Sequence, residues 1–502
     1  MRVGVRVQNL ALVCKEIFMK KIKSIVVASL LAYGPANWAT ESLSLEQSVE
    51  RAILSNPEVG ARFQDFQSSL EGKNVARGAL LPEVNASGWT GHEWEGSASD
   101  RPSSDWTRRG YTVELRQLLF DGFSTLNAVK QLGFEKLSGY YELLATVDNV
   151  ALAAAEAHID VLRYRALREL AEENYSMHVS TLRQIEERQR SGIGRGVDLE
   201  QAYGREALAQ SNVMTESGNL NDVLQRYQRL VGSPAPAILL APPSVAADLP
   251  QKPENFNHFL IRNPSLLSKQ ALTQAAKLGK DSAKGHLSPT LEFKAATGRD
   301  KNPNPNTPNY RDTQSSNVQL VMSYNLYRGG ADSARIRQTA AQEYAARDVR
   351  DYTCRNIQQE LNIAWNNIER IRAQIPFLEK HELATSRVRV AYMQQFQIGE
   401  RSLLDVLDTE NELFDARRAL INARYDLQQA ELRWLTFSHQ VLPALGLSTA
   451  YNEVAPDEIQ RLEISDEMIT ACARSTPDTS NLRPIEVKYS DNLQPPVIQY
   501  AN

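Results

Sequence analysis

The sequence contains no apolar run of the roughly 20 residues that a membrane-crossing helix needs. It also lacks a basic stretch with interleaved aromatic residues, and its formal net charge is −4, so nothing indicates nucleic-acid binding. No Ser/His/Asp or Cys/His set has the spacing of a catalytic centre, and no His and Cys residues have the spacing of a metal site. The sequence therefore predicts no enzyme, no cofactor and no metal.

Cysteine is also scarce, with three residues in 502. Cys14 lies in a segment that we expect to be removed, which leaves Cys354 and Cys472 in the mature chain. An exported compartment permits a disulfide. The number of cysteines alone does not decide whether these two residues form a disulfide.

The most apolar segment, from Ile25 to Gly34, follows three nearby lysines and precedes small residues. This pattern is typical of a secretory signal, with cleavage near residues 36–39. Met19 is the natural start of such a signal, so the first 18 residues fit an upstream start codon. We therefore expect a signal region over residues 1–39 and an exported protein.

Short motifs recur at a spacing of 207 residues, which predicts a tandem duplication. The matched pairs are Asn56-Pro57 with Asn263-Pro264, Leu119 to Gly122 with Leu326 to Gly329, Gly192 with Gly399, and Asp198 with Asp405. We expect a first repeat over residues 40–231, a linker over 232–255 and a second repeat over 256–440. Residues 441–502 are expected to form a C-terminal segment with a partly disordered tail.

Each repeat carries two segments in which apolar and polar residues alternate, as in strands with one apolar face. The clearest are the segments from Tyr111 to Leu115 and from Val318 to Leu326. Long helical stretches follow, over 123–190 and 331–398, the second with a likely kink at Pro376. Each long helix turns at a glycine, Gly192 or Gly399, and returns as a shorter helix over 197–231 or 402–438.

Four strands with one apolar face fit tilted strands that cross a bilayer, but four strands cannot close a barrel. Because open edges are not tolerated in lipid, the barrel must be shared between copies of the chain. Two copies would give eight strands around a filled interior, and three would give twelve strands around a possible pore.

The segment Ile398-Gly-Glu-Arg401-Ser-Leu-Leu-Asp405-Val-Leu-Asp408, together with the signal and the repeat, resembles the TolC family of outer-membrane channels. This resemblance implies a mixed α+β membrane protein, with four transmembrane strands per chain. Three copies would form a shared 12-stranded barrel, continued by a long α-helical barrel in the periplasm. The segment from Tyr324 to Ala334 is similar to the type I secretion branch, some of whose members export large adhesins.

The resemblance also implies partners: a membrane-fusion adaptor and an inner-membrane ABC transporter, which export a protein substrate of the adhesin or RTX type. An outer-membrane component of a multidrug efflux pump, working with an RND pump, is the alternative. A periplasmic coiled-coil adaptor fits less well, because it would have one hairpin and no paired lipid-facing strands.

Site residues follow from the same resemblance. Arg401 corresponds to a gate arginine, and Asp198 to its partner in the first hairpin. Asp405 and Asp408 lie three residues apart on one helix face and correspond to an acidic ring at the entrance. Phe396 stands where the family often has a tyrosine, so the gate loses a hydrogen-bond donor there.

The family's C-terminal segment wraps the tunnel from outside, which would carry Cys472 toward Cys354. A disulfide between these two residues is one expectation, and two buried thiols are the other.

Overall fold

The computed structural model describes residues 42–97, 103–192, 195–250, 257–304, 312–447, 455–464, 482, 485–488 and 497–500. The expected signal region 1–39, Met19 and Cys472 lie outside these residues. Cys354 is fully buried and disulfide-bonded, and because its expected partner Cys472 lies outside the described residues, the pairing of these two stays a prediction. Within the described ranges, no helix combines the length and the apolar composition that crossing a membrane requires.

The chain divides into two compact units. The described part of the smaller unit is a parallel pair of short strands, β1 (Ser42–Leu43) and β4 (Ile238–Leu239). The larger unit holds every other element, including a short antiparallel pair formed by β7 (Ile485–Lys488) and β8 (Val497–Tyr500). The arrangement that follows concerns this larger unit alone.

The larger unit confirms the internal repeat, because its main helices occur in pairs displaced by 207 residues. These pairs are α3 (Pro57–Gly78) with α7 (Pro264–Gly285), α4 (Ser124–Arg190) with α8 (Ala331–Gln397), and α5 (Gly196–Val231) with α9 (Leu403–Phe437). Shorter helices are α2 (Leu45–Ser55), α6 (Asn257–Leu260), α10 (Val441–Ala444), η1 (Ala246–Asp248) and η4 (Asp457–Arg461). Both long helices have 67 residues, and α8 continues through Pro376.

The same local signals start the equivalent helices. Asn56 caps α3 by accepting a hydrogen bond from the Glu58 amide, and proline follows as the first helical residue. Asn263 caps α7 in the same way through the Ser265 amide, again followed by proline. An asparagine cap satisfies an otherwise unpaired amide, and proline is tolerated where no amide is needed. The repeat therefore conserves the residues that begin a helix.

Four strands form one antiparallel sheet in the order β2-β3-β5-β6. Their bounds are β2 (Glu83–Glu95), β3 (Ser104–Phe120), β5 (Thr290–Lys301) and β6 (Asp312–Ser323). The β3–β5 pair joins the first repeat to the second. β2 and β6 are the outer strands, and no strand among the described residues pairs with their outer edges.

The two faces of this sheet differ in chemistry. On one face Val84, Val318 and Met322 are exposed by 63%, 72% and 70%. The other face carries ion pairs between strands, in which Arg108 Nε donates to Asp300 at 3.0 Å and Arg116 Nε donates to Glu292 at 3.0 Å. Lipid on one side and water on the other would match this pattern.

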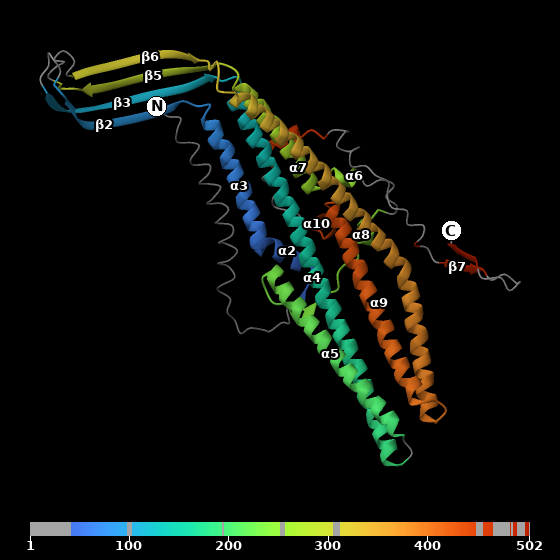
Figure 1. Cartoon of the computed structure of the whole chain (residues 1–502). Coiled ribbons are helices and arrows are strands. Elements are labelled where there is room, and N and C mark those ends of the chain that lie inside the picture. The colour runs from blue at the N-terminus through green and yellow to red at the C-terminus, as the bar shows by residue number, and fades with distance from the viewer. Residues whose placement is uncertain are drawn as a thin grey trace. The chain divides into compact units, whose positions relative to one another are not determined.

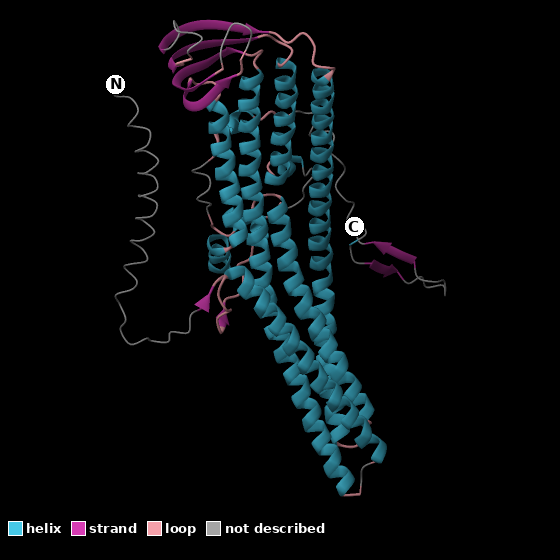
Figure 2. Cartoon of the chain, turned by 60° about the vertical axis from the view of Figure 1, so that its left-hand side comes forward, coloured by secondary structure: helices cyan, strands magenta, loops and turns pink. Residues whose placement is uncertain are grey.

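The sheet lies at one end of the long helices, and the α4–α5 and α8–α9 hairpins end on the opposite side (Figures 1 and 2). One expectation about the sheet was wrong in its extent. The alternating pattern predicted a strand through Leu326, but β6 ends at Ser323. The outer side of the following segment has no neighbouring strand in the described chain, so no partner is available there to continue the ladder.

The described C-terminal segment 455–464 is attached to the helices in part by one buried carboxylate. Glu458 forms ion pairs with Lys73 of α3 and with Lys136 of α4, the latter at 2.7 Å. Ile459 and Leu462 pack against a buried cluster that Phe66, Leu137, Tyr140, Tyr141, Leu144 and Ala271 form. A Cβ atom on Gly133 would lie 3.0 Å from the Glu458 carboxylate, so a small residue lets this segment approach α4.

Burial alone would raise the pKa of Glu458, but hydrogen bonds from Lys136 and Lys73 outweigh it and lower the pKa. The folded chain therefore holds this carboxylate ionised more firmly than the unfolded chain does. The resulting stabilisation is present above the unfolded pKa, and it is lost as the pH falls through the lower folded pKa.

We predict that Glu458→Gln loosens the attachment of residues 455–464 by about 1–3 kcal/mol, because two partly buried lysines lose their counter-charge. Hydrogen exchange at neutral pH should become faster in this segment and on the facing turns of α3 and α4. Asp457→Asn is the matched control, because Asp457 is exposed. Equal exchange in the two variants would show that the apolar packing and the hydrogen bonds from Gln270 and Gln274 to the Glu463 carbonyl hold the segment without this carboxylate.

Candidate functional site

The two helical hairpins end at turns that require glycine. Gly192 after α4 has φ 77°, and Gly399 after α8 has φ 83°. A Cβ atom at either position would meet no atom within 4 Å, so the requirement is the left-handed backbone and not a lack of space. Ser402 then caps α9 by accepting a hydrogen bond from the Asp405 amide at 3.3 Å. Both glycines thus have the turn role expected from the sequence.

Arg401 is held by residues of its own hairpin. Its Nε donates to Gln395 Oε1 at 2.9 Å, and its guanidinium carbon lies 4.3 Å from the centre of the Tyr392 ring. The guanidinium also lies 3.7 Å from the Asp405 carboxylate, which is in the first turn of α9. The stacking on the Tyr392 ring and the ion pair with Asp405 together hold the Arg401 side chain over the turn.

The two acidic residues of α9 are partly exposed, and each has a cationic neighbour. Asp405 faces Arg401 and accepts a hydrogen bond from Ser402 Oγ at 2.8 Å. Asp408 accepts a hydrogen bond from Arg205 of α5 at 2.6 Å, so it connects the second hairpin to the first. Both carboxylates lie in the first two turns of α9, and their negative charge is partly compensated.

Phe396 lies in an apolar cluster between the hairpins and is 5% exposed. The other buried members are Ile185 of α4, Ala202 of α5, and Leu403, Val406 and Leu407 of α9. The Arg188 guanidinium carbon lies 4.4 Å from the centre of the Phe396 ring. Phe396, singled out in the sequence because it lacks the hydroxyl of a tyrosine, is therefore a packing residue. It joins α8 to both helices of the first hairpin.

The hydrogen bond that we expected between Arg401 and Asp198 is not formed within this chain. Asp198 lies in the first turn of α5, and the ion pairs of the described residues do not include one with Arg401. The arginine instead contacts Gln395, Tyr392 and Asp405 of its own hairpin, which lie four to nine residues from it in the sequence. A link between Arg401 and Asp198 of different copies stays a prediction.

Sequence reasoning missed Arg205, Arg188 and Tyr392, which contact the expected site residues. Arg205 follows Asp198 by seven residues and so lies on the same face of α5, which was an available signal. Arg188 and Tyr392 have no such mark, because many charged and aromatic residues occur in these helices at similar spacing.

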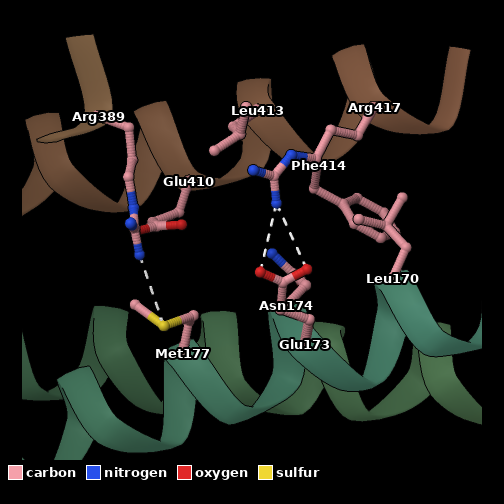
Figure 3. A pocket seen from close by; sticks show the side chains of 9 residues that line it. All are labelled: Leu170, Glu173, Asn174, Met177, Arg389, Glu410, Leu413, Phe414 and Arg417. Atoms are coloured by element: carbon pink, nitrogen blue, oxygen red, sulfur yellow. Dashed lines mark hydrogen bonds and ion pairs between the residues drawn. The ribbon is translucent and has the colours of Figure 1, made fainter. Parts of the chain in front are cut away.

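Further from the turns, charged side chains continue along the boundary between the hairpins (Figure 3). Arg389 of α8 donates to the buried Glu410 of α9 at 2.6 Å, and its other nitrogen lies 3.5 Å from Met177 Sδ of α4. Arg417 of α9 reaches Glu173 of α4 at 3.3 Å. These side chains line a pocket of about 50 Å³, which is large enough to hold water.

Two buried titratable groups also lie between the hairpins. Burial lowers the pKa of His178 on α4, so its imidazole is neutral at neutral pH. Burial raises the pKa of Asp148, while a 2.5 Å hydrogen bond with His439 opposes that rise. Asp148 lies on α4 and His439 follows α9, so this contact joins the two hairpins at the end nearer the sheet.

The chain is similar to known proteins both in sequence and in fold. A family model described as outer membrane efflux protein matches residues 48–233 and 256–435. The outer membrane efflux protein BepC of Brucella suis biovar 1 (strain 1330) is 26% identical over 447 residues, covering 86% of this chain and 92% of the relative. The alkaline protease secretion protein AprF of Pseudomonas aeruginosa is 27% identical over 417 residues, covering 78% and 83%.

Among solved structures, the CmeC outer membrane channel of Campylobacter jejuni superimposes with a TM-score of 0.72 at 14% identity. The match covers 84% of this chain and 90% of that one. At this identity the superposition shows that the two proteins share a fold.

We predict that Phe396→Ala weakens the packing between the hairpins by about 3 kcal/mol, because it leaves a cavity in a buried cluster. Hydrogen exchange should become faster in residues 182–206 and 396–408. The control is Ile398→Ala, which truncates a side chain that is 72% exposed two residues away and should change stability by less than about 0.5 kcal/mol. Unchanged exchange in the Phe396 variant would mean that polar contacts alone hold the hairpins together.

Proposed function

Because the chain belongs to the outer membrane efflux protein family, we propose that three copies of it form the outer-membrane exit duct of a protein secretion system. Family membership itself makes the chain an outer-membrane channel protein that extends into the periplasm. Such a protein transports and does not catalyse. The copy number, the partners and the cargo belong to the proposal.

The observation that carries the proposal is the open sheet at one end of two paired hairpins. Its exposed apolar face suits lipid, and its opposite face of charged residues suits a water-filled lumen. Three copies bring twelve strands, which leave room for a lumen, whereas eight strands would leave a barrel interior that side chains fill. The long helices of three copies would then continue the duct across the periplasm.

The hairpin ends are the proposed docking surface for a membrane-fusion adaptor and an inner-membrane transporter. Val197 and Leu404 occupy equivalent positions at the starts of α5 and α9, and they are 69% and 45% exposed. Exposed apolar side chains that recur at both hairpin ends favour contact with another protein over contact with water.

The cargo that we favour is protein, delivered by an ABC transporter as in type I secretion. AprF, whose name refers to secretion of an alkaline protease, is 27% identical to this chain. Efflux of small molecules is the second candidate, because BepC, named as an efflux protein, matches a larger share of the chain at 26% identity.

Complementation separates the two cargo classes. We predict that the chain restores secretion of an RTX-type protein to a host lacking its own outer-membrane channel, when supplied with a cognate ABC transporter and adaptor. Resistance to small toxic compounds, scored in the same host with an RND pump and its adaptor, is the parallel readout. Restored resistance without secretion would assign the chain to efflux, and restored secretion without resistance would support the proposal.

At the duct entrance, Arg401 is the proposed gate residue and Asp405 and Asp408 the proposed acidic ring. Around a three-fold axis these carboxylates would converge on one narrow opening and produce a negative potential. Arg401 and Arg205 would compensate part of that charge in the closed state. A single exposed ion pair contributes only about 0–1 kcal/mol, but three equivalent copies must open together.

We predict that Arg401→Ser raises single-channel conductance in planar bilayers, because the turn loses its contacts with Gln395 and Tyr392. The same change removes the counter-charge of Asp405, so a trivalent cation should block the channel at lower concentration. Arg190→Ser is the control, because Arg190 lies near the α4 turn and its side chain is 79% exposed. Wild-type conductance and wild-type block in the Arg401 variant would contradict both roles.

A further inference from the structure

The sheet contains a regularity that extends beyond one chain. The β2–β3 hairpin and the β5–β6 hairpin have the same register, since Glu83 opposite Arg116 becomes Thr290 opposite Ser323 when 207 is added to both numbers. The β3–β5 pair is the contact between the first repeat and the second, and it pairs Val113 with Thr297.

Resting on the proposed trimer, we propose that the outer strands β6 of one copy and β2 of the next pair antiparallel in the register of the β3–β5 contact. A ring of identical copies alternates first and second repeats, so each second repeat meets a first repeat of the following copy. Adding 207 to the number of a β3 residue gives the equivalent residue of the second repeat, in or just after β6. Subtracting 207 from the number of a β5 residue gives the equivalent residue of β2. Val113 opposite Thr297 becomes Leu320 opposite Thr90, and Gln117 opposite Phe293 becomes Tyr324 opposite Ala86.

The early end of β6 supports this register. Near the end of β3, Gln117, Leu118 and Phe120 have partners in β5 alone, because the β2–β3 ladder stops at Arg116, and Leu119 lies at a register shift between them. Their equivalents in the second repeat are Tyr324 to Tyr327, which would depend on β2 of the next copy. In the single chain these residues are not in a strand, and Leu326 and Tyr327 are 87% and 83% exposed.

Side-chain chemistry agrees with the same register. It keeps the exposed apolar residues of β6, such as Leu320 and Met322, on the same face as Val84 of β2. On the other face it places the two acidic residues Glu93 and Glu95 of β2 opposite the neutral Asn317 and Ser315. No like charges therefore face one another across the contact, where their repulsion would destabilise the pairing.

Cysteine pairs test the register in the full-length chain, oxidised in isolated outer membranes. The variant T90C/L320C should form a covalently closed trimer on a non-reducing gel, because directly opposed Cβ atoms lie about 4.5–5.5 Å apart. A86C/L320C and W94C/L320C are the matched controls. They displace the partner by four residues on the same face, or about 13 Å along the strand, and should stay largely unlinked.

A second matched pair, A86C/Y324C, tests whether Tyr324 joins the strand at the contact, with T90C/Y324C as its displaced control. The single variants T90C, A86C, L320C and Y324C report any linkage through the native cysteines. Native gels of the unoxidised proteins show whether the trimer is present.

Fast linkage of both matched pairs, at least tenfold over their controls, supports the register. Preferential linkage of a displaced pair in an intact trimer overturns the register and leaves the trimer standing. Absence of any linkage from T90C/L320C in an intact trimer overturns it as well. Absence of the trimer itself would overturn the assembly on which the inference rests.

Discussion

The constraint on which this structure depends is the satisfaction of backbone hydrogen bonds at the edges of its sheet. In a bilayer no water is available to an unpaired N–H or C=O group, and each costs several kcal/mol. The outer strands β2 and β6 have 13 and 12 residues, and their outer edges are unpaired within the described chain. Assembly is therefore a condition for membrane insertion. Because the unit is duplicated, each copy has one outer edge from its first repeat, on β2, and one from its second repeat, on β6.

At the other end of the helices, apolar packing outweighs polar contacts in holding the hairpins together. The ion pair between Arg205 and Asp408 is substantially exposed and contributes at most about 1 kcal/mol. The cluster around Phe396 is buried, and losing one such ring costs about 3–5 kcal/mol. A tip built in this way can change the number of its charged contacts without losing the hairpin structure.

Much of this architecture could be predicted from the sequence, because it is encoded by local signals. Asparagine and proline mark helix starts, glycine marks the hairpin turns, and alternation marks the strands, so a repeat of 207 residues was visible in them. The contacts between distant segments could not be predicted in this way. Glu458 pairs with Lys73 over 385 residues, and nothing local to either residue specifies the other.

The site was predictable to a similar degree. The position of Asp405 and Asp408 in the first two turns of α9 follows from local signals, whereas the burial of Phe396 depends on where a second hairpin packs. The end of β6 was misjudged because alternation describes what a segment can form. Whether Tyr324 to Tyr327 form a strand also depends on a neighbour that one sequence does not contain.

The central claim is that the open four-stranded sheet is one third of a closed barrel. The most direct measurement is the mass of the detergent-solubilised particle extracted from outer membranes, by native mass spectrometry or light scattering with the detergent contribution subtracted. The account predicts three chains per particle across the working range of protein concentration. A stable particle of one chain, with its strands still protected from hydrogen exchange, would contradict it.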